Sequence, residues 1–410
     1  MIVYHKTETY MKRNIIYITL SLMALLYTTG CSEWDLDTPP ASTIANFEFE
    51  LTNNGYAPCQ ATFTNLSLNA EGYSWDFGNG QTSTETNPVV QYETPGLYAT
   101  TLTCIPVNDV YYNSLKKTLV VNVKDPLAGF TQVFYYTTRG AESIGHMAIL
   151  TDDLPIVQDF EVLDMDLTRP YGFAADTAHG KVYVADFSAG VIFQFSADGK
   201  NPVKILDKNV AGQEIVGDPE AMFVYKDKLY WGRTGGIYRS NLDGTNPEEF
   251  INTGGNPPEF PIDMQIDPET EKIYLVNDKA DYTGGYFVVN FDGTGLTELI
   301  EDVDGCAIEV DFTTGKVYMA LYPSDEPPIE GGIYMCNLDG TDLAKIGETG
   351  SKATWGVTID HTRQKLFWGY KISNSGQDGK IVRSNLDGSN PEDWITGVSP
   401  HSMEVAWIKL

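Results

Sequence analysis

The chain has 410 residues, of which 27 are Lys or Arg and 56 are Asp or Glu, so its formal net charge at pH 7 is −29. This length predicts two or three domains. The surplus of acids argues against binding to nucleic acid or, through basic patches, to an anionic membrane face. Apolar residues make up 42% and charged residues 20%, which is typical of a folded protein. The abundance of Tyr, Phe, Gly and Pro favours an all-β protein of short strands joined by turns.

Residues 1–30 have the pattern of a secretory signal peptide. Lys12 and Arg13 precede an apolar run at residues 15–27, and small or polar residues follow it up to Gly30. The run is too short to cross a bilayer, which takes about 20 apolar residues. Met11 is an alternative start, because a signal of ordinary length begins there.

Cys31 directly follows Gly30 at the end of the signal, and this sequence resembles the lipobox of bacterial lipoproteins, although Thr28 stands where Leu is usual. The resemblance implies that Cys31 becomes the lipidated N-terminus. Residues 32–37 resemble the acidic export tag of Bacteroidetes surface lipoproteins. Residues 31–40, which end in Pro39-Pro40, are expected to be a tether. We therefore expect an outer-membrane, cell-surface protein that meets the membrane only through its lipid anchor; an ordinary secreted protein is the alternative.

Residues 41–125 alternate apolar and polar segments, as β-sandwiches do. Trp-Asp-Phe-Gly-Asn-Gly at 75–80 and a later strand with Tyr92, Gly96 and Tyr98 resemble the PKD domain family. The resemblance implies an Ig-like β-sandwich that acts as a spacer, with Trp75 and Tyr98 in core packing. Asn79 and Gln91 depart from the family pattern without threatening the fold. Cys59 and Cys104 are candidates for a disulfide, which the sequence leaves open.

Residues 128–410 contain a repeat of four short strands. An Asp-Gly turn between the third and fourth strands recurs every 45–49 residues. Its acids are Asp198, Asp243, Asp292, Asp339 and Asp387. Period and strand count are those of a propeller blade. Five repeats begin near Pro170, Pro219, Pro261, Gly305 and Thr354.

The two ends of this region supply the sixth blade. Residues 132–136 and 145–149 resemble second and third strands that lack a first strand, and residues 400–407 resemble a first strand with nothing after it. Joined, they make one hybrid blade that closes the ring. The sequence thus predicts a small β-sandwich followed by a six-bladed β-propeller.

The repeat resembles the YWTD (class B) repeats of the low-density-lipoprotein receptor family. Lys-Leu-Tyr-Trp begins at Lys228 and Lys-Leu-Phe-Trp at Lys365, and Ser-Asn-Leu-Asp-Gly follows at 240–244 and 384–388. The family's Thr-Asp after Tyr-Trp is mostly missing. The resemblance implies the fold but not the function, because such propellers include receptors, lactonases, lyases and binding modules.

Ligand sites of propellers usually lie where the innermost strands begin. Alignment of the six first strands places aromatic, His and carboxylate side chains at this mouth, with Glu309 and Glu404 deeper. The loops between second and third strands contribute to the same face, and the long ones at Tyr322 and Tyr370 are expected to carry binding specificity. The candidate ligand-binding residues are Tyr171, Glu220, Asp263, Glu309, Tyr322, Trp355, Tyr370, His401 and Glu404. Such a mouth could stack on a sugar ring and hydrogen-bond its hydroxyls.

We expect a non-catalytic binding protein for a glycan or protein ligand, because no complete catalytic constellation is present. The alternative is a metal-dependent lactonase or lyase. Gluconolactonase-like propellers hold a divalent cation in this channel, and Glu220 and Asp263 fit such a ligand set, but its Asn has no clear counterpart. No cofactor is expected in the first case; calcium is the candidate in the second. A third hypothesis is a scaffold in an outer-membrane uptake complex.

Overall fold

In the computed structural model the chain forms two compact units. The first ends at Pro126 and the second begins at Leu127. The structure describes residues 41–107, 112–138, 145–150, 155–160, 169–253, 260–277, 284–325, 328–352, 354, 356–373 and 378–410. These residues form strands and two 3-10 turns, η1 (Asn53–Gly55) and η2 (Glu214–Val216), and contain no α-helix. Accordingly, the described residues offer no helix with the length and apolarity needed to cross a membrane.

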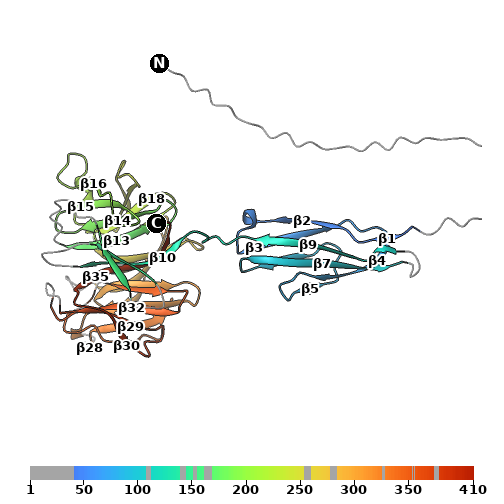
Figure 1. Ribbon diagram of the computed structural model, residues 1–410. Helices are drawn as coiled ribbons and strands as arrows, with labels where there is room; N and C mark the ends of the chain where they lie inside the picture. The colour runs from blue at the N-terminus through green and yellow to red at the C-terminus, as the bar shows by residue number, and fades with distance from the viewer. Residues whose placement is uncertain are drawn as a thin grey trace, which may run out of the picture. The chain divides into compact units, whose positions relative to one another are not determined.

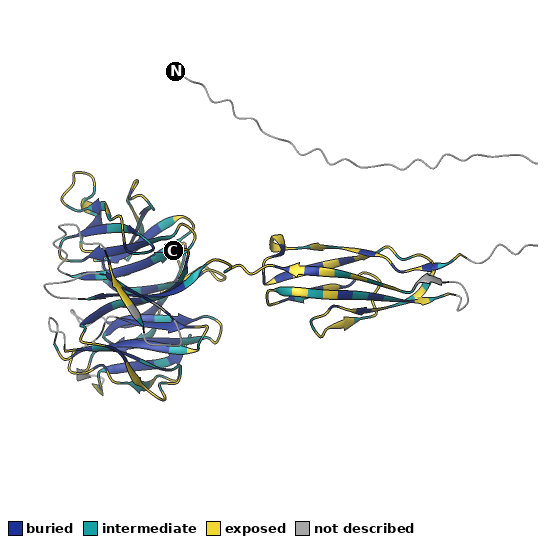
Figure 2. Ribbon diagram, in the orientation of Figure 1, coloured by how far each residue is buried: buried dark blue, intermediate teal, exposed yellow. Residues whose placement is uncertain are grey.

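The first unit consists of two antiparallel sheets around one core (Figure 1). One sheet has the order β2 (Phe47–Leu51), β3 (Cys59–Asn65), β6 (Val89–Tyr92). The other has the order β5 (Thr82–Ser83), β4 (Ala70–Asp76), β7 (Gly96–Pro106), β9 (Lys116–Val123). A short parallel pair, β1 (Thr43–Ile44) and β8 (Tyr112–Ser114), completes the unit. Buried residues alternate with exposed ones along most strands (Figure 2), as in a sandwich with one wet face per sheet.

Trp75 is a core residue, as predicted: it is 1% exposed, and its indole N–H donates to the Glu85 carbonyl at 2.9 Å. Tyr98 packs on Tyr92 with ring centroids 4.6 Å apart. The two departures from the family pattern touch each other, because the Asn79 side-chain amide donates to the Gln91 carbonyl. The acceptor is the main-chain oxygen of Gln91, so this bond does not depend on which side chain stands at 91.

The disulfide considered for Cys59 and Cys104 is not formed. Both are buried free thiols. Cys59 begins β3 and Cys104 lies on β7, so they belong to different sheets. The Cys104 thiol instead donates to the Ser67 hydroxyl at 3.3 Å.

In the second unit, the described residues form six four-stranded antiparallel sheets. Five follow directly along the chain: β13 (Pro170–Asp176), β14 (Lys181–Asp186), β15 (Val191–Ser196), β16 (Val203–Asp207); β17 (Met222–Tyr225), β18 (Lys228–Arg233), β19 (Gly236–Asn241), β20 (Glu248–Asn252); β21 (Pro261–Asp267), β22 (Lys272–Asn277), β23 (Gly285–Asn290), β24 (Thr297–Glu301); β25 (Gly305–Asp311), β26 (Lys316–Leu321), β29 (Gly332–Asn337), β30 (Ala344–Gly347); and β31 (Val357–Asp360), β32 (Lys365–Tyr370), β33 (Lys380–Asn385), β34 (Glu392–Thr396). A hairpin of β27 (Ser324–Asp325) and β28 (Pro328–Ile329) lies between β26 and β29.

The sixth sheet joins both ends of the unit. Its order is β12 (Ile156–Asp159), β11 (Gly145–Ile149), β10 (Thr131–Thr138), β35 (Pro400–Ile408). Strands β10 and β35 pair antiparallel, with Tyr135 opposite Glu404. The first strands then contact one another in a closed series: β13 with β17, β17 with β21, β21 with β25, β25 with β31, β31 with β35, and β35 with β13.

Acidic residues build the turns of the repeat. Between first and second strands, the buried Asp267 carboxylate accepts the Glu269 N–H at 2.9 Å and the Thr270 hydroxyl. Between third and fourth strands, Asp243 accepts the N–H and hydroxyl of Thr245 at 2.9 and 2.6 Å. These bonds hold the pKa of Asp243 below its usual value. Much of the negative charge therefore serves turn geometry.

Candidate ligand-binding channel

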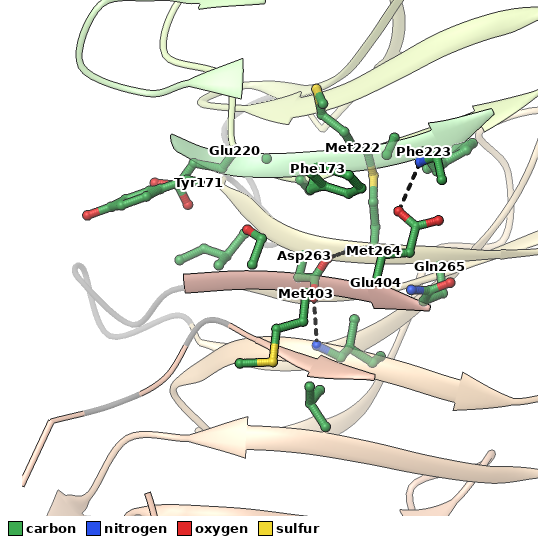
Figure 3. A pocket seen from close by; sticks show the side chains of 18 of the residues that line it. Tyr171, Phe173, Glu220, Met222, Phe223, Asp263, Met264, Gln265, Met403 and Glu404 are labelled. Atoms are coloured by element: carbon green, nitrogen blue, oxygen red, sulfur yellow. Dashed lines mark hydrogen bonds between the residues drawn. The ribbon is translucent and has the colours of Figure 1, made fainter. Parts of the chain in front are cut away.

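A cavity of about 180 Å³ lies among the six first strands of the second unit. All six strands contribute to its lining, including Phe173 from β13, Met222 from β17, Met264 from β21, Ile308 from β25 and Met403 from β35. Figure 3 shows several of these side chains around the cavity together with Tyr171, Asp263 and Glu404. The cavity is below the range of about 300–1,000 Å³ that is typical for drug-sized ligands. It therefore fits one small group of a ligand and not a long chain.

An aromatic cluster lies beside the cavity. We call Tyr171, His401, Phe187 and Phe260 the mouth cluster. The rings of Tyr171 and His401 stack with centroids 3.9 Å apart and planes at 19°. Tyr171 also stacks on Phe187 at 5.4 Å, and Phe187 meets Phe260 edge to face at 6.2 Å. Because Tyr171, Phe187 and Phe260 are half-buried, their rings keep accessible surface.

Polar residues at the ends of two second strands position this cluster. The Asp186 carboxylate accepts the Arg169 N–H at 2.8 Å, and the residue after it is Phe187. In the equivalent place, the Asn277 side-chain oxygen accepts the Phe260 N–H at 2.7 Å. These bonds tie the loop before a first strand to the end of a second strand, so the aromatic residues sit on constrained backbone.

The polar side chains of the channel bond across neighbouring sheets. Asp263 on β21 accepts the Ile308 N–H of β25 at 2.9 Å, and Glu404 on β35 accepts the Ala175 N–H of β13 at 2.9 Å; Figure 3 shows these bonds as dashed lines. Thr358 on β31 accepts the Val405 N–H of β35 at 3.2 Å. First strands have an unpaired edge toward the channel, and these side chains satisfy part of it.

Burial changes the acidity of these carboxyl groups. Loss of solvation raises the pKa of Asp263 to about 7, although N–H groups of Ile308 and Met264 oppose the shift. It raises the pKa of Glu404 to about 8, and the nearby Asp263 adds to this. Burial, followed by repulsion from Glu404 and Asp263, raises the pKa of Glu309 well above its usual value. All three are half-buried residues. Near neutral pH such carboxyls can donate as well as accept hydrogen bonds.

Glu220 and Asp263, the two candidate metal ligands, line the same cavity. Glu220 is 4% exposed. Both Asp263 oxygens already accept backbone N–H groups, from Met264 and Ile308. Within the described ranges, no three or more His, Cys, Asp or Glu side chains are grouped closely enough to hold a metal ion. Among the described residues, Glu220 and Asp263 thus have no third acidic, His or Cys side chain grouped with them as a ligand.

The structure brings together most of the ring predicted from the repeat. Tyr171, Glu220, Asp263 and Glu404 line the cavity. His401 joins them by stacking on Tyr171. Glu309 is linked to Asp263 and Glu404 by electrostatic repulsion.

The two loop tyrosines lie elsewhere. Tyr322 and Tyr370 both pack on the apolar cluster around Trp368, and Tyr370 lines a different groove. Trp355 and Cys31 lie outside the described residues.

Phe187 and Phe260 belong to the mouth cluster but were not among the predicted residues. Phe187 follows the second strand β14, and Phe260 precedes the first strand β21. A signal exists for Phe187, because loops between second and third strands are expected near the mouth, but not for Phe260, which lies in the connection from a fourth strand to a first strand. The repeat aligns the first strands but not the residues that flank them, so it does not predict these two rings.

Comparison with known proteins identifies one domain family and several similar folds. Residues 37–122 match the PKD domain family. Among solved structures, the chain resembles one described as a nidogen/laminin complex, with a TM-score of 0.53 and 17% identity over 67% of this chain and 98% of that chain. This likeness supports an all-β, propeller-like fold and carries no function.

Weaker likenesses include TolB from Acinetobacter baumannii, with a TM-score of 0.49 and 11% identity over 76% of this chain and 80% of that chain. A gluconolactonase from Xanthomonas campestris has a TM-score of 0.45 and 14% identity over 65% of this chain and 86% of that chain. At these scores neither carries an argument about activity.

Proposed function

We propose that the second unit is a closed six-bladed propeller whose channel mouth binds a glycan. One observation carries the proposal: the partly accessible rings of Tyr171 and Phe187 stack beside a small cavity lined by carboxyl groups whose pKa values are raised by burial. Aromatic faces pack against the C–H face of a sugar ring. Carboxyls with raised pKa values can accept from and donate to sugar hydroxyls. The cavity size fits one sugar residue at the end of a chain.

Calorimetry with neutral oligosaccharides and the purified protein tests the site. We expect Tyr171→Ala to weaken binding by at least about tenfold, that is ~1.4 kcal/mol, because it removes the central ring of the mouth cluster. Tyr56→Ala, which removes a 41% exposed tyrosine of the first unit, is the matched control and should not change affinity. Equal affinity of Tyr171→Ala and wild type would remove the channel mouth as the site. Binding of a protein in place of every sugar would favour the protein-ligand alternative.

We further propose that the protein is a cell-surface lipoprotein, with the PKD domain as spacer between anchor and propeller. The support is the sequence around Cys31 and the family match at residues 37–122. We expect Cys31→Ser to move the protein from the membrane fraction to the soluble exported fraction and to abolish labelling with a fatty acid. A pull-down from membranes tests the proposed place in an outer-membrane uptake complex.

The metal-dependent lactonase alternative has less support. Glu220 and Asp263 are its two candidate ligands, and the backbone bonds to both Asp263 oxygens compete with a cation. Elemental analysis of the purified protein for calcium, manganese and zinc separates the two functions. A stoichiometric divalent ion that is lost in Asp263→Asn would favour the enzyme.

A further inference from the structure

One position of the repeat holds a ring in nearly every sheet. Among the described residues, one equivalent position of the third strand carries an aromatic or imidazole ring in five of the six sheets. This residue pairs across the ladder with one equivalent position of the second strand. The pairs are Phe193 with Val184, Tyr238 with Trp231, Phe287 with Leu275, Tyr334 with Met319, and His146 with Tyr136. The sixth pair is Val382 with Trp368, where the ring is replaced by two methyl groups.

A groove of about 470 Å³ lies at this exception. It runs between strand β30 of one sheet and strands β32, β33 and β34 of the next. Ile346, Trp368 and Val382 form its apolar wall. Trp368 is 2% exposed and fixed by an indole N–H bond to the Glu348 carbonyl at 2.9 Å, so the wall is rigid. This volume falls within the range of about 300–1,000 Å³ found for small-molecule sites.

The corresponding place beside Trp231 is filled. The Tyr238 ring lies 6.2 Å from the Trp231 ring, and Arg233 lies 4.5 Å from the Tyr238 ring. The 3-10 turn η2 adds the fully buried Val216 to the same apolar cluster. The groove beside Trp368 therefore arises where the chain has omitted the ring that its other sheets contain.

The rim of the groove is charged but balanced. Among the side chains that line the groove, Lys345 pairs with Glu348 at 3.0 Å and Lys380 pairs with Asp393 at 2.7 Å; Glu330, which does not line it, also pairs with Lys345 at 3.1 Å. Lys380 also lies 4.7 Å from the centre of the half-buried Tyr370 ring. Paired charges provide donors and acceptors with little net field, so they suit an uncharged, hydroxyl-rich ligand better than an anion or a cation.

We propose that this groove is a second binding site, and that it takes one sugar residue of a neutral glycan. The ring of the sugar occupies the space that the Tyr238 ring fills in the other repeat, with its C–H face against the accessible part of the apolar wall at Ile346 and beside the half-buried Tyr370. Its hydroxyls meet the rim pairs of Lys345 and Lys380. The choice of a glycan as ligand rests on the proposed function. The site itself is separate, because none of the mouth-cluster residues lines the groove.

Calorimetry with cellobiose, maltose, xylobiose and mannobiose on the full protein tests the proposal. A disaccharide that occupies both sites should bind wild type with a stoichiometry of about two. Val382→Tyr restores the ring of the repeat, fills the groove and should lower groove affinity by at least about tenfold, leaving one site. Tyr171→Ala should remove the other site. The two variants thus separate failure of the groove from failure of the channel mouth.

Tyr238→Val is the matched control. It makes the reverse exchange, Tyr to Val, at the equivalent position of the sheet that contains Trp231. It should retain groove binding. Lys380→Gln should weaken binding without altering the apolar wall, which keeps the test independent of how well Val382→Tyr folds. Unchanged binding in both Val382→Tyr and Lys380→Gln would overturn the proposal. So would a groove that binds none of the disaccharides, or one that binds N-acetyl-tyrosine amide instead, which would indicate an aromatic side chain of a protein partner.

Discussion

Burial raises the pKa values of Asp263 and Glu404 to about 7 and about 8, whereas the turn residues Asp243 and Asp387 have lowered pKa values. The difference comes from surroundings. The turn acids are exposed and accept N–H and hydroxyl groups of the next residues, whereas the channel acids have lost most of their solvation. Acidic residues thus serve as charged turn formers between third and fourth strands and as hydrogen-bonding groups with raised pKa values in the channel.

This contrast predicts a pH dependence of stability. A carboxyl whose pKa rises from 3.8 to about 7 on folding binds more protons in the folded state between those values. The free energy of unfolding should therefore fall as pH rises from about 4 to about 7, by an amount of the order of a few kcal/mol. Asp263→Asn should flatten this fall, as measured by urea unfolding at several pH values.

His146 has the opposite effect on the pH dependence. Burial lowers its pKa below 6.5, so the folded state binds fewer protons there than the unfolded state, and its contribution to the free energy of unfolding increases with pH. The comparison must therefore be made between the variant and wild type and not on the wild-type curve alone. An Asp243→Asn variant, which changes an exposed turn acid, is the control and should leave the slope between pH 5 and pH 7 unchanged. Parallel curves for Asp263→Asn and wild type would contradict the raised pKa.

At the scale of elements, the Asp-Gly turn is repeated but its surroundings are not. Gly244 and Gly293 both have positive φ, 79° and 83°. A Cβ on Gly244 would lie 2.2 Å from the Ile205 carbonyl oxygen of the neighbouring sheet, whereas on Gly293 the nearest atom is Ile251 Cγ1 at 3.6 Å. The turn at Gly244 therefore also packs tightly against the backbone of the neighbouring sheet.

We expect Gly293→Ala to cost about 1–2 kcal/mol of unfolding free energy, the usual penalty for a left-handed conformation. Gly244→Ala carries the same penalty and adds a clash with backbone, which cannot move aside as a side chain can. It should therefore be the more destabilising change, by at least about 1 kcal/mol. Thermal unfolding of both variants measures the difference, and equal losses would show that the sheets can separate at Ile205.

The repeat explains why the elements could be predicted and part of the site could not. Asp-Gly turns and paired strands depend on neighbours in the chain, so β19 and β20 were evident from residues 236–252. The bond from Ala175 to Glu404 joins residues 229 positions apart, and the stack of Tyr171 on His401 is similarly remote. Alignment placed these residues in one ring but not their contacts or their pKa values. The groove at Val382 was missed because its signal is an absent ring.

For the whole molecule, the sixth sheet is the point at which the second unit is fastened. Removing residues 400–410 deletes β35, which pairs with β10 and contacts β13 and β31. The unit would then have an open ring and an exposed edge. We expect calorimetry to show loss of its cooperative transition, with the transition of the first unit retained because that unit has its own core.

Removal of residues 409 and 410 alone is the control, since both follow β35 and both are exposed. It should leave both transitions in place. A cooperative second transition after removal of 400–410 would show that five sheets and three strands form a stable domain without closure.

Closure by β35 also has a consequence for synthesis. Five sheets are made of strands that emerge one after another from the ribosome, but β10 waits for a partner that ends at Ile408. The same late strand carries His401 and Glu404 into the channel. A prematurely terminated chain therefore lacks both the strand that pairs with β10 and part of the proposed binding site. Binding at the proposed mouth site would therefore require that translation had reached the end of β35.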